Sequence, residues 1–102
     1  MSDSRRYTAT GRERRAIRAA LHSARAVVQV GKGGLDARVI ASAEQAISSR
    51  EAIKIAVGRG CPLDPLDVAG RLARALDAEL VGCAGRTALL YRPEESEPKQ
   101  FE

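Results

Sequence analysis

The sequence predicts a small α/β domain in which three helices and four strands follow the order αβαβαββ. Three segments carry apolar residues at helical spacing, and short runs rich in Val, Ile and Leu follow them. Glycine, proline and helix-capping residues separate these elements, and the chain has no internal repeat. Because 102 residues can enclose only one modest core, we expect a single domain over residues 10–92.

The first predicted helix follows a polar segment, residues 1–9, which we expect to be a flexible arm. Thr10 and Glu13 have the spacing of a capping box, so the helix should begin just after Thr10 and run to about Ala24. One apolar stripe of this helix is expected to face the core. It consists of Ile17, Ala20, Leu21 and Ala24.

A glycine-rich segment joins the first predicted strand to the second helix. β-branched residues predict a strand over about residues 26–30, and Asp36 can cap a helix over about residues 37–49. That helix has a clean apolar face made of Val39, Ile40, Ala43, Ala46 and Ile47. The segment between strand and helix, Gly31-Lys32-Gly33-Gly34, has almost no side chains that would keep a ligand from the backbone.

The second half of the chain predicts a strand, a helix and a hairpin. Apolar residues alternate over about 52–57, and after a loop Asp64-Pro65 has the composition of a helix start. This third helix should end at Asp77 or Ala78, and its inner face is Ala69, Leu72, Ala73 and Leu76. Strands over about 79–84 and 87–91 are joined by Gly85-Arg86, which suits a tight hairpin. Residues 93–102 hold four glutamates and two prolines and are predicted to be an acidic, disordered tail.

Charge is spread unevenly along the chain. The net charge is +4, but residues 93–102 carry −3, so the other 92 residues carry +7. A globular part this basic favours a polyanionic partner such as nucleic acid. With one Phe, two Tyr and no Trp, stacking on aromatic side chains cannot be the main way of holding bases.

Metal, redox and membrane sites are poorly supported by the composition. Cys61 and Cys83 are too few and too far apart for a disulfide framework or a zinc site, and the chain has one histidine. We therefore expect no metal, no cofactor and two reduced thiols in a cytoplasmic protein. No apolar run approaches the length that spans a membrane, and the first residues lack the apolar segment of a signal peptide.

A basic stripe runs along the first predicted helix, beside its apolar stripe. It consists of Arg14, Arg18, His22 and Arg25, with Arg15 next to it. Guanidinium groups spaced in this way can follow a phosphate backbone, and His22 could add a hydrogen bond. A plain solvated surface is an equally valid interpretation, because arginine is a good helix former.

The glycine segment also has two interpretations. Gly31, Gly33 and Gly34 can let a phosphate or sugar approach the backbone, with helix N–H groups behind them and the Lys32 cation at the tip. The same glycines can simply form a tight turn. Arg38, in the first turn of the second predicted helix, is expected to neutralise a phosphate together with Lys32, Arg14, Arg18 and Arg25. The weaker candidates for RNA contacts are His22, Lys54, Arg86 and Arg92.

Several separated motifs together resemble the YhbY-like CRM (chloroplast RNA splicing and ribosome maturation) domain. The resemblance covers about residues 9–92. It rests on Thr10-Gly11-Arg12-Glu13-Arg14, Ile17-Arg18, Leu21-His22, Val27-Val28-Gln29-Val30-Gly31-Lys32-Gly33-Gly34-Leu35, Ile53-Lys54, Gly85-Arg86-Thr87 and Leu90-Tyr91-Arg92. The family's pattern is not matched everywhere, since Ala26 replaces a usual proline and the loop over residues 59–66 differs.

The resemblance implies a two-layer α/β fold with a mixed four-stranded sheet, like the C-terminal domain of bacterial initiation factor three. It implies an RNA-binding protein, without catalytic residues, that associates with precursors of the large ribosomal subunit. The glycine segment, which is similar to the GxxG loop of KH domains, is then the expected RNA contact beside the basic helix. We expect a monomer whose partner is ribosomal RNA.

Two other functions remain compatible with the sequence. A glycine-rich turn between strand and helix also holds mononucleotides, although this one lacks the Lys-Ser/Thr of a P-loop. A nucleotide-binding enzyme is therefore the less favoured alternative. The same basic surface could instead bind an acidic protein, which would make the chain an interaction adaptor on the ribosome.

Overall fold

The computed structural model describes residues 10–93. It contains α1 (Gly11–Leu21), β1 (Val28–Val30), α2 (Ala37–Arg50), β2 (Ala52–Val57), α3 (Pro65–Leu76), β3 (Glu79–Ala84) and β4 (Thr87–Tyr91). This order confirms the predicted αβαβαββ arrangement. The arm predicted over residues 1–9 and the tail predicted over 93–102, apart from Pro93, lie outside the described residues.

The four strands form one mixed sheet in the order β1-β2-β4-β3. β1 and β2 are parallel, whereas β4 is antiparallel to both β2 and β3. The sheet therefore has the mixed, four-stranded character that the resemblance implied. Because β1 and β2 are parallel, the loops that follow them leave the sheet at the same end.

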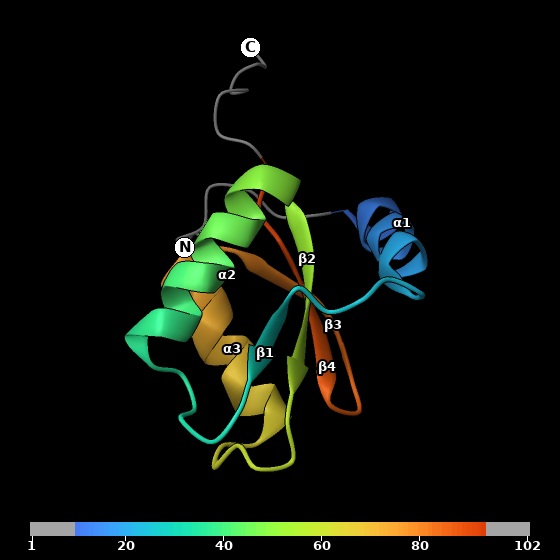
Figure 1. Cartoon of the computed structure of the whole chain (residues 1–102). Coiled ribbons are helices and arrows are strands. Elements are labelled where there is room, and N and C mark those ends of the chain that lie inside the picture. Colours follow the sequence, from blue (N-terminus) through green and yellow to red (C-terminus); the bar gives the residue numbers. More distant parts are fainter. Residues whose placement is uncertain (1–9, 94–102) are drawn as a thin grey trace, which may run out of the picture.

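Helices α2 and α3 cover one face of the sheet (Figure 1). The residues predicted for their inner faces line a core that also contains Ile53 and Ile55 of β2. Ile55, Leu72 and Leu90 are fully buried there. The predicted N-caps are confirmed, since Asp36 accepts a hydrogen bond from Val39 N and Asp64 accepts one from Leu66 N.

Helix α1 lies on the other face of the sheet, away from α2 and α3 (Figure 1). Its capping box is present, with Glu13 N donating to Thr10 Oγ1 and Thr10 N donating to Glu13 Oε1. It ends at Leu21, three residues earlier than predicted, because the chain turns there to reach β1. No residue of α1 is buried, so the prediction that its apolar stripe belongs to the core was wrong.

Within residues 10–93, no helix combines the length and the hydrophobicity that crossing a lipid bilayer requires.

Candidate nucleic-acid interface

Two glycine-containing turns lie next to each other where β1 and β2 end. The first, Gly31–Gly34, is closed by a hydrogen bond from Gly34 N to Gly31 O at 3.0 Å, and the second, Gly58–Cys61, by one from Cys61 N to Gly58 O at 3.1 Å. Gly58 N also donates to Val30 O at 2.8 Å, which links the second turn to the start of the first. We call these eight residues the paired-turn surface.

The backbone favours glycine at one position of the paired-turn surface, and at a second position the two turns lie in close contact. Gly34 has a φ of +65°, a conformation that L-residues with side chains rarely adopt. A Cβ atom at Gly60 would lie 3.4 Å from Lys32 Cγ, so a side chain there would press on the lysine of the neighbouring turn. By contrast, a Cβ atom at Gly31 would meet no atom within 4 Å, which shows how open the first turn is.

Three exposed cations surround these turns: Lys32 at the tip of the first, Arg59 at the tip of the second, and Arg38 in the first turn of α2. Their side chains make no hydrogen bond or ion pair with any residue between 10 and 93. Across the same range, no backbone carbonyl accepts a hydrogen bond from the N–H groups of Lys32 or Arg59. Cationic side chains and backbone donors are thus both available to an anionic ligand.

Arg59 is a candidate that the sequence did not single out. Its loop carries no motif of its own, and only the parallel pairing of β1 with β2 brings it beside Lys32. The signal that could have found it is topological. Once two consecutive strands joined by a helix are taken as parallel, their following loops must share one end of the sheet.

Arg86 lies at the same end of the sheet, but its side chain is engaged within the protein. Its Nε donates to Val57 O and its Nη2 donates to Gly58 O, both at 2.8 Å. Arg86 therefore fixes the carboxyl end of β2 and the beginning of the second turn. The structure gives Arg86 a positioning role that uses two of its five N–H groups, and its weaker candidate contact with a phosphate stays a prediction.

The basic stripe of α1 does not flank the glycine turn, contrary to expectation. Arg14 forms an ion pair with Glu79, and its Nε lies 3.0 Å from Glu79 Oε2. Glu79 pairs with Tyr91 in the sheet, and Tyr91 pairs with Ala52 at the start of β2. Arg14 is consequently at the end of the sheet opposite the paired-turn surface. A helical stripe predicted from spacing does not specify which part of the sheet it covers, and this is why the expectation failed.

Arg18 packs on an irregular part of β3. The register of β3 against β4 shifts between Leu80 and Gly82, and Arg18 Nη1 donates to Val81 O at 3.1 Å within this bulge. Gly82 makes room for the arginine stem, since a Cβ atom there would lie 3.3 Å from Arg18 Cδ. Arg18 thus holds α1 to the sheet, and one of its five N–H groups is used in doing so.

Lys54 serves as the anchor for the end of α1. Its Nζ donates to Leu21 O at 3.2 Å, to His22 O at 3.1 Å and to Ala24 O at 3.1 Å. An ammonium group has three N–H donors, so all of them are used. Lys54 is therefore a positioning residue, whereas His22 and Arg25, which flank this anchor, remain exposed.

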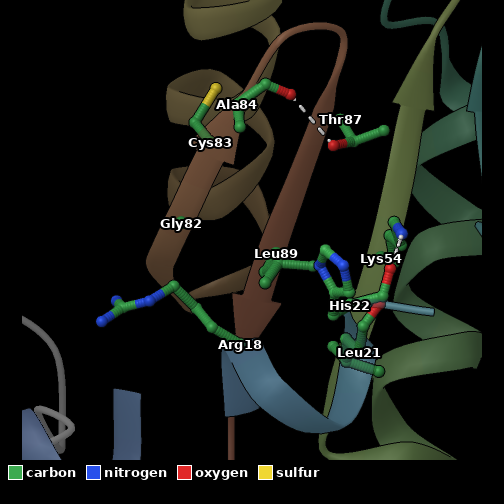
Figure 2. A pocket seen from close by; sticks show the side chains of 9 residues that line it. All are labelled: Arg18, Leu21, His22, Lys54, Gly82, Cys83, Ala84, Thr87 and Leu89. Atoms are coloured by element: carbon green, nitrogen blue, oxygen red, sulfur yellow. Dashed lines mark hydrogen bonds between the residues drawn. The ribbon is translucent and has the colours of Figure 1, made fainter. Parts of the chain in front are cut away.

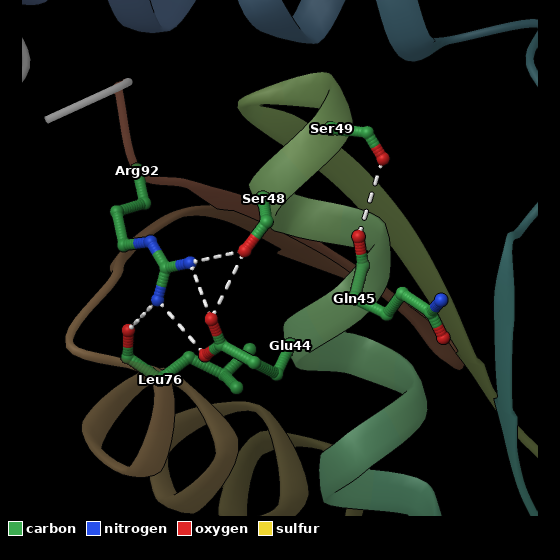
Figure 3. Close-up of polar contacts among 6 residues, drawn as sticks. All are labelled: Glu44, Gln45, Ser48, Ser49, Leu76 and Arg92. Carbon is green, nitrogen blue, oxygen red and sulfur yellow. Dashed lines mark hydrogen bonds and ion pairs between the residues drawn. The ribbon is translucent and has the colours of Figure 1, made fainter. Parts of the chain in front are cut away.

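Arg92 lies at the end of the sheet opposite the paired-turn surface, and its side chain is on the side of α2 and α3. Its guanidinium donates to Glu44 Oε1 at 3.0 Å, to Ser48 Oγ at 3.0 Å and to Leu76 O at 2.7 Å (Figure 3). The hydrogen bond from Arg92 lowers the pKa of the Glu44 carboxyl below its ordinary value, against a smaller opposing effect of burial. Arg92 clamps α2 to the end of α3, and its expected RNA contact has no geometric support.

The predicted site residues therefore fall into three groups. Gly31, Lys32, Gly33 and Gly34 belong to the paired-turn surface, with Arg38 beside it on α2 and Arg86 behind it. The α1 face carries Arg14, Arg18, His22, Arg25 and Lys54, and Arg92 is at the end of the sheet opposite the paired turns. Among residues 10–93, no group of three or more His, Cys, Asp or Glu side chains could hold a metal ion. Cys61 is buried, and Cys83 is exposed.

The chain is similar to known proteins over nearly its whole described length. Residues 10–92 match the family model of the CRS1/YhbY (CRM) domain. The Bacillus subtilis protein named "Probable RNA-binding protein YqeI" is 38% identical over 93 residues, which span 91% of this chain and 96% of the relative. The Methanocaldococcus jannaschii protein named "Probable RNA-binding protein MJ0652" is 35% identical over 97 residues, or 93% of this chain and 72% of the relative.

A solved structure has the same fold. The solution structure of the hypothetical protein SAV1595 from Staphylococcus aureus superposes with a TM-score of 0.74 at 30% sequence identity. The match covers 93% of this chain and 98% of that protein. Fold and sequence therefore agree on one family.

Proposed function

This chain belongs to the CRS1/YhbY (CRM) domain family, and we propose that it is an RNA-binding protein that grips the RNA backbone at the paired-turn surface. The proposal is supported first by the two curated relatives, which are both named as RNA-binding proteins. It is supported second by the geometry of Gly31–Gly34 and Gly58–Cys61, which are held side by side. RNA backbone recognition needs close approach and positive charge, and both are available there.

The observation that carries the proposal is the pairing of two open turns, each with a cation at its tip. A Cβ atom placed on Gly31 would have open space around it to 4 Å, so a phosphate can approach the backbone there. Lys32 and Arg59 can then neutralise consecutive phosphates from either side, with Arg38 as a third cation. The positive end of α2 adds to the attraction, since its N-terminus lies directly behind the first turn.

The finer part of the proposal concerns the RNA and the setting. We take the ligand to be ribosomal RNA in precursors of the large subunit, bound by a monomer in the cytoplasm without any catalysis. This rests on the family to which the chain belongs and on the +7 charge of the chain outside residues 93–102.

The salt dependence of RNA binding tests whether the paired-turn surface contacts the phosphates of the RNA backbone. Fluorescence anisotropy of a labelled RNA, titrated with the full chain at several salt concentrations, gives the slope of log K against log salt. Lys32→Ala and Arg59→Ala should each weaken binding to all sequences alike and reduce that slope by about one. The matched control is Arg71→Ala, because Arg71 is an exposed arginine on α3, outside both turns. Unchanged slopes in both variants would remove the paired-turn surface from the interface.

Crosslinking in cells, followed by sequencing of the attached RNA, tests the finer part. Enrichment of large-subunit precursor RNA is the expected result, and enrichment of unrelated RNAs would contradict it. Two further outcomes would favour a different function. Association with ribosomal particles that survives complete nuclease digestion would favour a protein-interaction adaptor, and turnover of nucleoside triphosphates by the pure chain would favour an enzyme.

A further inference from the structure

The open face of the sheet carries a hollow of about 170 Å³ between the end of α1 and the β3–β4 hairpin (Figure 2). Leu21, Leu89 and Gly82 contribute apolar surface to it, and Arg18, His22 and Lys54 contribute cationic or polar groups. Cys83 lies at the hairpin end, where its thiol is exposed. No aspartate or glutamate lines the hollow. It is therefore complementary to a ligand that is flat and apolar in one part and anionic in another.

The backbone at His22 is fixed by the lysine anchor. Lys54 binds the carbonyl of His22 itself and those of Leu21 and Ala24 on either side. In the view of Figure 2 the imidazole projects from the end of α1 between Leu89 and Lys54. The exposed ring is therefore available for a second flat ring to stack on it. Stacking on histidine is a common way for proteins to hold an unpaired RNA base.

Cations for the accompanying phosphates lie around His22. Arg18 uses one N–H on Val81 O, and the remaining N–H groups of its guanidinium have no described acceptor. Arg25 is exposed three residues beyond His22. The hollow thus offers one place for a base, and two cations lie near it for the adjoining backbone: Arg18 in its lining and Arg25 close by in the chain.

The β3–β4 hairpin connects the hollow to the paired-turn surface. Ala84 and Thr87 line its hairpin end, and Thr87 pairs with Ala56, the residue before the last of β2. The next hairpin residue, Arg86, binds Gly58 O at the start of the second turn. A single strand can therefore leave the paired turns, cross the hairpin at Arg86 and enter the hollow without passing a carboxylate of the hairpin.

We propose that this hollow binds one unpaired base of single-stranded RNA, stacked on His22 against Leu89, while Arg18 and Arg25 hold the flanking phosphates. The proposal rests on the function proposed above and extends it: the paired turns hold the backbone, and the hollow requires an unpaired nucleotide next to it. The protein should then prefer single-stranded RNA, or a junction with an unpaired base, over a continuous duplex.

Alkylation of Cys83 tests whether RNA occupies the hollow. Iodoacetamide should modify Cys83 in the free chain and spare the buried Cys61, which serves as an internal control in the same mass spectrum. With a short single-stranded RNA at about ten times its Kd, only roughly one tenth of the protein is free, so alkylation should slow about tenfold. A duplex of the same sequence should protect Cys83 less.

His22→Ala provides the second measurement. We expect it to weaken binding of the single strand roughly fivefold or more, to leave duplex binding unchanged, and to be rescued by His22→Phe, which can still stack. His22 is exposed, so the variant should keep the fold, as circular dichroism can verify.

The outcomes separate the two proposals. One outcome is that anisotropy shows RNA binding, Cys83 is alkylated as fast as in the RNA-free protein, and His22→Ala binds normally. The proposal of base binding in the hollow is then wrong, and the proposed function stands. If no RNA binds at all, both are overturned. If an acidic peptide protects Cys83 and single-stranded RNA does not, the hollow is a protein-docking surface and the base-binding proposal is wrong.

Discussion

The two faces of the sheet hold their helices by different means. On one face, α2 and α3 pack against Ile53, Ile55 and Leu90 through side chains that are almost wholly removed from water. On the other face, α1 buries no residue and is attached by polar groups. Its attachments are the Arg14–Glu79 ion pair, the Arg18 bond to Val81 O and the Lys54 bonds to three carbonyls.

This difference shows that cations on a basic surface can have two functions. Each α1 attachment uses a cationic side chain that a sequence pattern would assign to a phosphate. Arg18 can hold the helix and still offer N–H groups to a ligand, whereas Lys54 cannot, because its three donors are occupied. A positive potential on this face therefore comes from more residues than those that can touch RNA.

The largest expected effect is a difference in folding stability between truncating a side chain under α2 and α3 and truncating one on α1. Ile55→Ala should lower the free energy of unfolding by about 2–5 kcal/mol, because Ile55 is fully buried and its truncation leaves a cavity. The same change in α1, Ile17→Ala, should lower it by only about 1 kcal/mol, because that side chain is half-buried. Urea denaturation followed by circular dichroism measures both. Equal losses would mean that α1 covers a second apolar core.

A smaller effect should distinguish the anchoring arginine from its neighbour. Arg14→Ala removes the ion-pair partner of Glu79, whose residue is 1% exposed, and should lower the free energy of unfolding by about 1–3 kcal/mol. Arg15→Ala, one residue away and exposed, should change it by less than about 0.5 kcal/mol. High salt should preserve the difference, because a buried carboxylate is poorly screened.

The double variant Arg14→Ala/Glu79→Gln makes that measurement specific to the ion pair. Removing the carboxylate charge together with its partner leaves no buried charge to solvate, so part of the lost stability should return. A double variant less stable than either single variant would show that Arg14 and Glu79 act independently.

Local signals were sufficient for most of the fold. The three N-caps and the strands over residues 52–57, 79–84 and 87–91 were predicted at their observed bounds, because each has a strong pattern within a few residues. α1 was predicted as a helix, but its place was not. Periodicity reports that one side of a helix meets protein, and it does not report whether that contact is a deep core or the rim of a sheet.

The candidate site was less predictable, since its contacts join distant parts of the chain. Lys54 and Arg86 were recognised as basic residues, yet their acceptors are carbonyls about 30 residues away in sequence. Arg59 was missed for the same reason, because only the parallel register of β1 and β2 places it by Lys32. A sequence shows which residues are charged, whereas the fold decides which groups their side chains contact.

The smallest expected effect concerns the ion pair on the apolar face and its dependence on pH. Arg92 lowers the pKa of Glu44, so the folded state favours the ionised carboxylate and gains stability above the carboxyl's ordinary pKa of 4.5. That gain is lost as pH falls through the lowered pKa. Because the Glu44 side chain is 50% exposed, solvent screening limits the effect to about 0.2–1 kcal/mol.

Glu44→Gln should therefore be less stable than the parent chain near neutral pH, and the difference should disappear as the solution is acidified below pH 4.5. Urea denaturation at a series of pH values measures it. The same substitution in an Arg92→Met background should show a smaller pH-dependent difference, because Ser48 still donates a hydrogen bond to Glu44. A loss as large as that of Arg14→Ala would contradict the contrast between the two pairs. The Glu79 carboxylate is almost fully buried, so water cannot readily replace Arg14, whereas the half-exposed Glu44 can exchange Arg92 for water.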